Sequence, residues 1–187
     1  MSELRISGGM YRGRKIQVPP TARPTEGRVR EALFSILADR LEGAVVLDLF
    51  AGSGALAFEA LSRGAAKAVL IDSAKRTVEV LGKSRDQLGL GKDDAIILLA
   101  TLPASKPSDK LVAEGPFDLI FADPPYDFEQ REELLVMAAP LLKVGGDFVF
   151  EHSSRHPAPE SCGELTLHRV RCYGGSALSF YRHAALS

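Results

Sequence analysis

The chain has 187 residues, 45% of them hydrophobic and 25% charged, a composition typical of one soluble domain with a sizeable core. No window reaches the roughly 18 apolar residues that a membrane span needs, and the N-terminus lacks the apolar core of a signal peptide. We therefore expect a cytoplasmic protein with no membrane partner. Cys162 and Cys172 are too far apart for a Cys-x-x-Cys motif, so we expect free thiols.

The net charge of −1 hides an asymmetry along the chain. Residues 1–30 contain seven basic and two acidic residues, a balance of +5, and the remaining residues balance to −6. A basic segment on a mildly acidic body indicates a polyanionic partner, although charge alone fits a solvated surface equally well.

The N-terminal segment is expected to be an extended arm. Residues 1–22 alternate loosely and are broken by glycines, which predicts a basic β-hairpin, and residues 23–187 are expected to form a single domain. A helix is predicted to begin after Thr25, as its N-cap, and to stop at Gly43. Its apolar face consists of Val29, Leu33, Ile36, Leu37 and Leu41.

From Ala44 onward, strands and helices alternate. The run AVVLDLF is apolar nearly throughout, as in a strand buried on both faces of a parallel sheet. This alternation is typical of an α/β fold, here with seven mostly parallel strands, helices on both faces and a closing edge hairpin. The predicted strands are 44–50, 67–72, 95–100, 117–123, 145–152, 164–174 and 176–183, and the predicted helices are 54–64, 75–91 and 129–142, with a polar connection over 103–116 that has room for a short helix.

The first of these strands runs into LDLFAGSGALA, which fits the pattern G-x-G-x-x-G/A at Gly52, Gly54 and Ala57. Small residues let the backbone turn tightly and approach a ligand at the start of the next helix. The second strand ends at Asp72, about 20 residues further on, where a carboxylate can accept from both ribose hydroxyls. Together these features predict a cofactor that contains adenosine.

The charge beside the glycines discriminates between cofactors. Asp48 ends the first strand, where its carboxylate would repel a pyrophosphate and attract an ammonium group. S-adenosylmethionine carries an ammonium and a sulfonium, so this position favours it over NAD. The alternatives are an NAD-dependent oxidoreductase, or Asp48 as a turn-capping residue.

The stretch FDLIFADPPYDF ends a buried strand with an unusual group of residues. Pro124 and Pro125 hold the backbone extended and remove two N–H donors, which leaves the Asp123 carboxylate and nearby carbonyls as acceptors. Tyr126 adds a flat face for stacking. Acceptors beside a stacking ring suit a planar group with N–H donors, such as the exocyclic amine of a nucleobase.

A methyl-transfer mechanism follows from this arrangement. Hydrogen bonds to Asp123 and the Pro124 carbonyl help localise the lone pair of the amine, and Asp123 then accepts the proton. The base has to be unpaired or flipped out. Guanine offers N1–H and N2–H₂, which one carboxylate can accept together, so Asp at this position favours guanine over adenine.

Two sets of segments carry a family resemblance. VLDLFAGSGALAFEALSRGA and DLIFADPPY resemble the class I S-adenosylmethionine methyltransferases that modify exocyclic nitrogens. RISGGMYRGRKIQVP, RPTEGRVREALFSIL and the late RCYGGSALSFY narrow this to a resemblance to the RsmD family, which methylates guanine N2 in 16S ribosomal RNA of the small subunit. The resemblance covers nearly the whole chain and implies a Rossmann-like fold, S-adenosyl-L-methionine as cofactor, and 16S rRNA in the small subunit or its assembly intermediate as partner.

The same resemblance implies roles by position. Catalytic roles fall to Asp123, Pro124, Pro125 and Tyr126. Cofactor contacts fall to Asp48, Phe50, Ala51, Gly52, Ser53, Gly54, Asp72, Ser73, Arg23 and Thr25, and to the backbone of Ala100, Thr101 and Leu102, where related enzymes often carry an acid. Contacts with RNA phosphates fall to Arg12, Arg14, Lys15, Arg28 and Arg30.

Other features are weaker. His152 and His156 are four residues apart, a spacing that can ligate a metal, but no third ligand is evident and we expect no metal. We also expect a monomer. The alternative functions are methylation of a DNA base or a protein glutamine, the oxidoreductase above, and a non-catalytic RNA-binding module.

Overall fold

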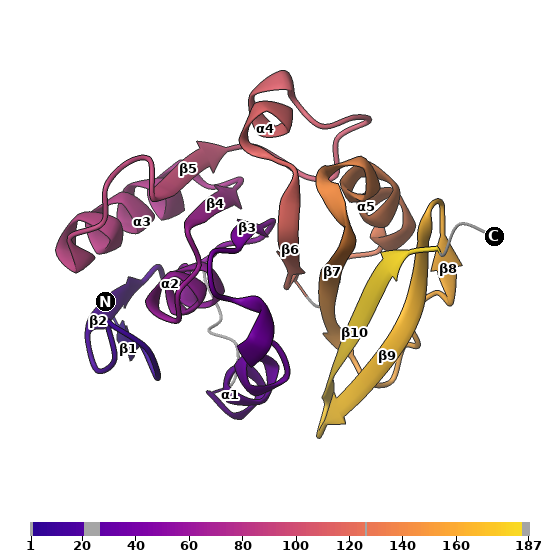
Figure 1. Cartoon of the computed structure of the whole chain (residues 1–187), viewed down its shortest axis with the longest axis horizontal. Helices are drawn as coiled ribbons and strands as arrows, with labels where there is room; N and C mark the ends of the chain where they lie inside the picture. The colour runs from indigo at the N-terminus through magenta and orange to yellow at the C-terminus, as the bar shows by residue number, and fades with distance from the viewer. Residues whose placement is uncertain (1, 21–26, 126, 185–187) are drawn as a thin grey trace. The chain divides into compact units, whose positions relative to one another are not determined.

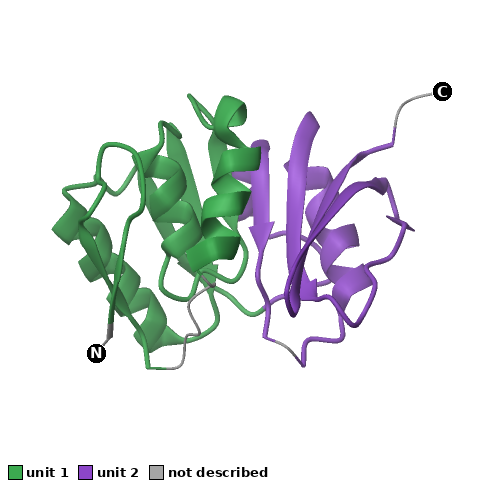
Figure 2. Ribbon diagram, turned by 90° about the horizontal axis from the view of Figure 1, so that it is seen from below, with its two compact units in different colours: residues 1–101 green, residues 102–187 purple. Residues whose placement is uncertain are grey.

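The computed structural model describes residues 2–20, 27–125 and 127–184, and Figure 1 shows the order of their helices and strands. Arg23, Thr25 and Tyr126 lie outside the described residues. The chain divides into two compact units, residues 1–101 and 102–187 (Figure 2). The predicted boundary between an arm over 1–22 and a domain over 23–187 stays a prediction.

The first unit combines an N-terminal hairpin with three parallel strands. The hairpin strands pair antiparallel, with Leu4 opposite Ile16. The parallel strands follow the order β5-β4-β3, and their pairing brings the residues after all three carboxyl ends to one edge. The elements are β1 (Ser2–Arg5), β2 (Lys15–Val18), α1 (Gly27–Ile36), β3 (Val45–Asp48), α2 (Ala55–Ser62), β4 (Lys67–Asp72), α3 (Lys75–Leu88) and β5 (Ala95–Leu99).

The first predicted helix is shorter than the sequence pattern suggests. It ends at Ile36 and continues as a 3₁₀ turn over Ala38–Arg40, where the Arg40 N–H donates to the Leu37 carbonyl at 2.9 Å. This tighter turn keeps Leu37 and Leu41 buried, together with Val29 and Leu33, and leaves Ile36 half-buried. The predicted apolar face is therefore largely right, although the predicted stop at Gly43 is wrong.

The second unit contains five strands in the order β6-β7-β10-β9-β8. β6 and β7 are parallel, and β10, β9 and β8 continue as antiparallel neighbours, which confirms the predicted closing hairpin. The two-residue strand β8 was not predicted, so the larger sheet of the described residues has eight strands where seven were predicted. The elements are α4 (Asp109–Glu114), β6 (Phe117–Ala122), α5 (Arg131–Ala138), a 3₁₀ turn (Ala139–Leu141), β7 (Leu142–Ser153), β8 (Ser161–Cys162), β9 (Leu165–Tyr173) and β10 (Ser176–His183).

The Rossmann-like α/β fold predicted from the alternation of strands and helices is thus confirmed. The central strands are buried along nearly their whole length, as parallel strands covered on both faces should be: β4 buries Ala68 to Ile71, and β6 buries Leu119 to Ala122. No helix among the described residues is long and apolar enough to cross a membrane.

One backbone contact fixes the hairpin on α2. Gly9 adopts a positive φ of 76°, and the next N–H, of Met10, donates to the Ser62 carbonyl at 2.7 Å. A Cβ at Gly9 would overlap that same carbonyl. Gly13 also has a positive φ, of 81°, but a Cβ there would meet nothing within 4 Å.

These two glycines predict different costs of substitution. Gly13→Ala should lower the free energy of unfolding by about 1–2 kcal/mol, because it adds only the strain of a left-handed conformation. Gly9→Ala should cost a further 1–3 kcal/mol, roughly, because the hairpin also has to move away from α2. Urea unfolding of both variants measures the difference, and equal losses would contradict the tight approach at Gly9.

Candidate functional site

The glycine loop between β3 and α2 is held by the acid at the end of β4. Gly52 and Gly54 have positive φ angles of 52° and 77°, which non-glycine residues rarely adopt. The Asp72 carboxylate accepts from the backbone N–H of Gly52 at 3.0 Å and of Ala74 at 2.9 Å. Asp72 therefore connects the loop to the start of α3, and its remaining lone pairs can still accept from a ligand.

The second glycine of the loop is required by packing. A Cβ at Gly54 would collide with the Phe58 ring and lie within 3 Å of a methyl group of Leu81. Gly54 is also the N-cap of α2, and its carbonyl accepts from the Phe58 N–H at 2.8 Å. Close packing at this point fixes where α2 begins.

The other predicted cofactor residues of the first unit gather at the same strand ends. Backbone hydrogen bonds join these ends, from Ala51 to the Ile71 carbonyl at 2.9 Å and from Ala100 to the Asp72 carbonyl at 3.0 Å. Asp48, Ala51 and Ser53 are buried, Phe50 and Gly52 are half-buried, and Ser73, Ala100 and Thr101 are exposed. Leu102, which opens the second unit, is half-buried.

This edge suits a ligand rich in donors. It presents a buried residue, Asp48, a half-buried residue, Asp72, both with carboxylates, and the exposed residues Ala100 and Thr101. The ammonium and ribose hydroxyls of S-adenosylmethionine are donors of the kind that carboxylates accept, so the residues present fit that cofactor.

No metal site accompanies these groups: within the described ranges, no three His, Cys, Asp or Glu side chains are grouped to hold an ion. The ring of His152 instead lies within hydrogen-bond distance of the Ser153 carbonyl, at 2.9 Å, and of the Ser179 hydroxyl, at 2.8 Å.

In the second unit, the predicted base-binding residues directly follow β6. Asp123 and Pro124 are half-buried and Pro125 is exposed. The Pro125 carbonyl accepts from the Phe128 N–H at 3.0 Å, shortly after the end of the strand. The neighbouring strand runs past this point, because Ala122 pairs with Phe150 and β7 continues to Ser153.

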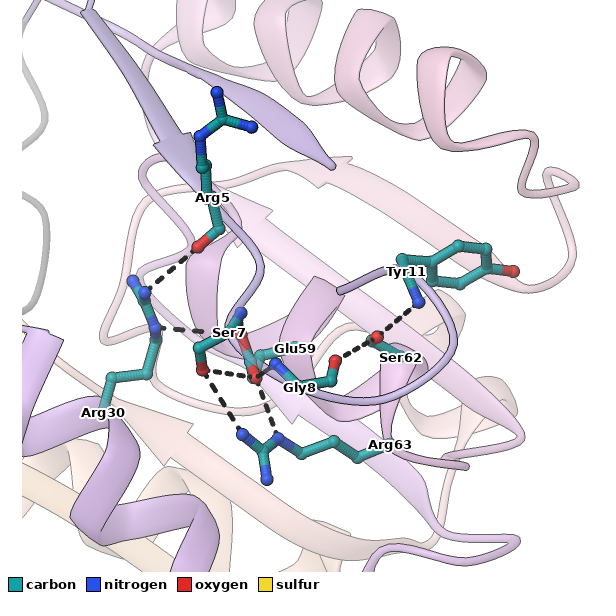
Figure 3. A network of polar contacts seen from close by, with 8 residues as sticks. All are labelled: Arg5, Ser7, Gly8, Tyr11, Arg30, Glu59, Ser62 and Arg63. Atoms are coloured by element: carbon teal, nitrogen blue, oxygen red, sulfur yellow. Dashed lines mark hydrogen bonds and ion pairs between the residues drawn. The ribbon is translucent and has the colours of Figure 1, made fainter. Parts of the chain in front are cut away.

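The N-terminal hairpin is anchored by a carboxylate that our sequence analysis missed. Glu59 of α2 is 1% exposed and accepts hydrogen bonds at 2.8 Å from the Ser7 N–H, the Ser7 hydroxyl and the Gly8 N–H (Figure 3). The Arg63 Nε donates to the same carboxylate at 2.8 Å, and the Arg30 Nε lies 3.9 Å from it. The hairpin, α1 and α2 thus meet at one carboxylate.

A second side chain of α2 strengthens this attachment. The Ser62 hydroxyl accepts from the Tyr11 N–H at 2.8 Å and donates to the Gly8 carbonyl (Figure 3). Every residue of α2 is buried. Glu59 and Ser62 are therefore polar residues in a helix covered on all sides, and a Glu inside the apolar run ALAFEAL is the sequence signal that could have identified them.

Three of the predicted RNA-contacting cations have partners within the protein, although Arg14 and Lys15 are themselves exposed. Arg14 donates to the carbonyls of Gln87 and Leu88 at 2.9 Å and so caps the end of α3, and Lys15 pairs with Glu3. Arg30 is 6% exposed and donates to the Arg5 carbonyl at 3.2 Å.

Burial lowers the pKa of Arg30, while the nearby acids, chiefly Glu59, act to raise it. Its guanidinium is enclosed beside Glu59, which does not favour the predicted contact between Arg30 and phosphates, and that contact stays a prediction. Arg12 and Arg28 are exposed.

Comparisons with known proteins agree along nearly the whole chain. A family model described as conserved hypothetical protein 95 matches residues 4–182. Ribosomal RNA small subunit methyltransferase D of Escherichia coli K12 is 36% identical, over 98% of this chain and 91% of that protein. The solved structure of Escherichia coli yhhF has a TM-score of 0.83 at 33% identity and covers 99% of this chain and 100% of its own. Hypothetical protein TTHA0928 of Thermus thermophilus has a TM-score of 0.76 at 32% identity, with coverages of 96% and 99%.

The hydrogen bonds and ion pairs of Glu59 predict a large loss of stability when its carboxylate is removed. Glu59→Ala leaves the Arg30 guanidinium buried without its ion pair and removes the acceptor for the hairpin, so it should cost about 3–5 kcal/mol of unfolding free energy. Glu79→Ala, at an exposed position of α3, is the control and should change it by less than about 0.5 kcal/mol. Equal values for the two variants in urea unfolding would contradict the anchor.

Proposed function

The chain belongs to the family described as conserved hypothetical protein 95, the RsmD family, and from this premise we propose that it methylates the exocyclic N2 of a guanine in 16S ribosomal RNA, with S-adenosylmethionine as methyl donor. The observation that carries the proposal is the 36% identity, along 98% of the chain, to a small-subunit rRNA methyltransferase. We propose that the enzyme acts as a monomer, in the cytoplasm, on the small subunit or its assembly intermediate.

The first unit provides the cofactor-binding part of this proposal. Asp72 accepts from the ribose hydroxyls while it keeps its hydrogen bond to Gly52, so binding requires no rearrangement of the loop. Asp48 attracts the ammonium group, and the backbone of the exposed residues Ala100 and Thr101 lies beside the adenine. When bound, the cofactor supplies a methyl group on a sulfonium, which is activated without help from a metal. Arg23 and Thr25 are proposed cofactor contacts outside the described residues.

The second unit provides the base-binding part. Asp123 and the carbonyls beside it accept from N1–H and N2–H₂ of guanine, and the prolines contribute no competing donor. Accepting from the amine orients its lone pair, and most of the acceleration comes from this positioning. The methylated nitrogen is strongly acidic, so Asp123 only has to accept the proton that leaves. Tyr126, outside the described residues, is the proposed stacking partner.

Two exposed cations of the first unit, Arg12 and Arg28, are the proposed phosphate contacts there, because the other candidates, Arg14, Lys15 and Arg30, already have partners within the protein. Their proposed task is to orient the particle and not to read its sequence.

Methyl transfer from radiolabelled S-adenosylmethionine tests the proposal with three acceptors: unmethylated small subunits, duplex DNA, and a glutamine-containing peptide. Label in the ribosomal RNA alone is expected. Equal label in DNA or peptide would favour the alternative amino-methyltransferases, and binding of NAD without S-adenosylmethionine would favour an oxidoreductase.

Asp123→Ala should show whether Asp123 acts on the base or binds the cofactor. We expect the rate of transfer to fall at least 100-fold, since it loses both the positioning and the proton acceptor, with cofactor affinity within about twofold of the unsubstituted protein. Asp93→Ala, at an exposed carboxylate ahead of β5, is the matched control and should retain activity. Collapse of cofactor affinity in Asp123→Ala, measured by calorimetry, would assign this residue to the cofactor instead.

Substitutions should distinguish the arginines of the first unit that bind RNA from the one that stabilises the fold. Arg12→Ala with Arg28→Ala should weaken binding to small subunits and reduce the slope of log affinity against log salt by about 1–2, with unfolding unchanged. Arg30→Ala should do the reverse, since its cation is buried beside Glu59. An unchanged salt slope in the double variant would show that these two arginines do not contact phosphates.

A further inference from the structure

Strand β9 is uncovered on both faces over part of its length. A strand with one covered face alternates between buried and exposed residues, but His168 to Cys172 are five exposed residues in succession. Its neighbour β10, by contrast, is buried from Ser176 to Tyr181. Figure 1 shows β9 and β10 as a long two-stranded ribbon whose turn lies at the end where β6 and β7 finish.

The hairpin of β9 and β10 is basic. No acidic residue occurs from Leu165 to Ala184. Arg169 and Arg171 are exposed and project from the same face of β9, two positions apart. Neither has an ion pair within the part of the chain that the structure describes, whereas Arg182 of β10 is paired with the Asp147 carboxylate at 2.7 Å.

A third arginine lies beside the turn between β9 and β10. The loop after β7 is tied to that turn, because the Ser154 N–H donates to the Gly175 carbonyl at 2.9 Å and the Ser154 hydroxyl to the Gly174 carbonyl at 3.1 Å. The next residue, Arg155, is exposed. We call Arg155, Arg169 and Arg171 the basic ribbon.

The strand register places the basic ribbon level with the proposed base-binding residues of the same unit. Ala122 of β6 pairs with Phe150, Phe150 with Ser179, and Ser179 with Val170. The residue after Val170, Arg171, is therefore level with Asp123, which follows Ala122. Three strand spacings of about 4.8 Å separate the two positions, or roughly 14 Å, which is within the reach of a few nucleotides.

We propose that the basic ribbon binds the phosphates of the substrate RNA that flank the guanine held at Asp123. The inference rests on the proposed function and adds a second RNA-contacting surface, in a different unit from Arg12 and Arg28. The partner is a nucleic-acid backbone because Arg169 and Arg171 are exposed guanidinium groups on a hairpin, Leu165 to Ala184, that contains no acidic residue, and guanidinium groups match phosphate geometry. These contacts position the RNA and do not read its bases.

The test compares two double variants of the full-length protein. Arg169→Ala with Arg171→Ala removes two charges from the basic ribbon. Lys106→Ala with Lys110→Ala removes two charges from an exposed part of the same unit around the start of α4. Binding to unmethylated small subunits is measured against salt concentration, together with kcat, KM for the particle and affinity for S-adenosylmethionine.

The ribbon variant should bind at least tenfold more weakly, with a salt slope smaller by about 1–2, a raised KM and unchanged kcat and cofactor affinity. Arg169→Lys with Arg171→Lys should restore most of the slope, because it keeps the charge. Arg155→Ala, which leaves β9 intact, should show about half the change in slope and provides the test if the double variant is unfolded.

Two outcomes would overturn the inference. If the unsubstituted protein binds and methylates the particle while the ribbon and lysine variants behave alike, the basic ribbon does not contact RNA and the proposed function stands. If the unsubstituted protein neither binds nor methylates ribosomal RNA, both proposals fail.

A photocrosslinker attached to Cys172 identifies what the basic ribbon contacts. Cys172 is exposed on β9, and Cys162 is buried, so labelling should favour Cys172. Crosslinks to 16S rRNA are expected. Crosslinks only to ribosomal proteins would replace RNA with an acidic protein partner.

Discussion

The buried carboxylate of Glu59 determines how the N-terminal third of the chain is organised. A carboxylate at 1% exposure is expensive to desolvate, and it is stabilised here by hydrogen bonds from Ser7, Gly8 and Arg63 and by the nearby Arg30. The hairpin, α1 and α2 each contribute to this group. Because α2 begins at the glycine loop, the hairpin is held by the same helix that fixes the proposed cofactor-binding loop.

The arginines considered above fall into two groups, those with partners in the fold and those proposed to contact RNA. Arg14, Arg30 and Arg63 neutralise or cap groups inside the first unit, so their charges serve the fold. Arg12, Arg28 and the basic ribbon are exposed, as Arg14 is, and are the proposed RNA contacts. Net charge along the sequence cannot make this distinction, since it counts a buried ion pair and a solvated cation alike. Proposed RNA contacts thus occur in both units, and the second set lies level with the base-binding strand end.

The fold was predictable because alternating apolar strands and amphipathic helices encode it locally. The prediction failed where the signal is short or long-range. Two-residue β8 is too short for a pattern, and Leu37 and Leu41 continue a helical stripe although the chain has already tightened into a 3₁₀ turn. The glycine loop and its acid were recognisable from spacing, and the structure adds the hydrogen bond that joins Gly52 to Asp72. The burial of Arg30 was not predictable, because its partner Glu59 is distant in sequence.

The identity of the methylated nucleoside tests the central claim most directly. Small subunits lacking their base methylations would be incubated with this protein and labelled S-adenosylmethionine, and the RNA digested and its nucleosides separated and identified by mass spectrometry. We predict that the label is in N2-methylguanosine. Label in methyladenosine or methylcytidine, or in no nucleoside at all while the cofactor binds, would contradict the proposed reaction.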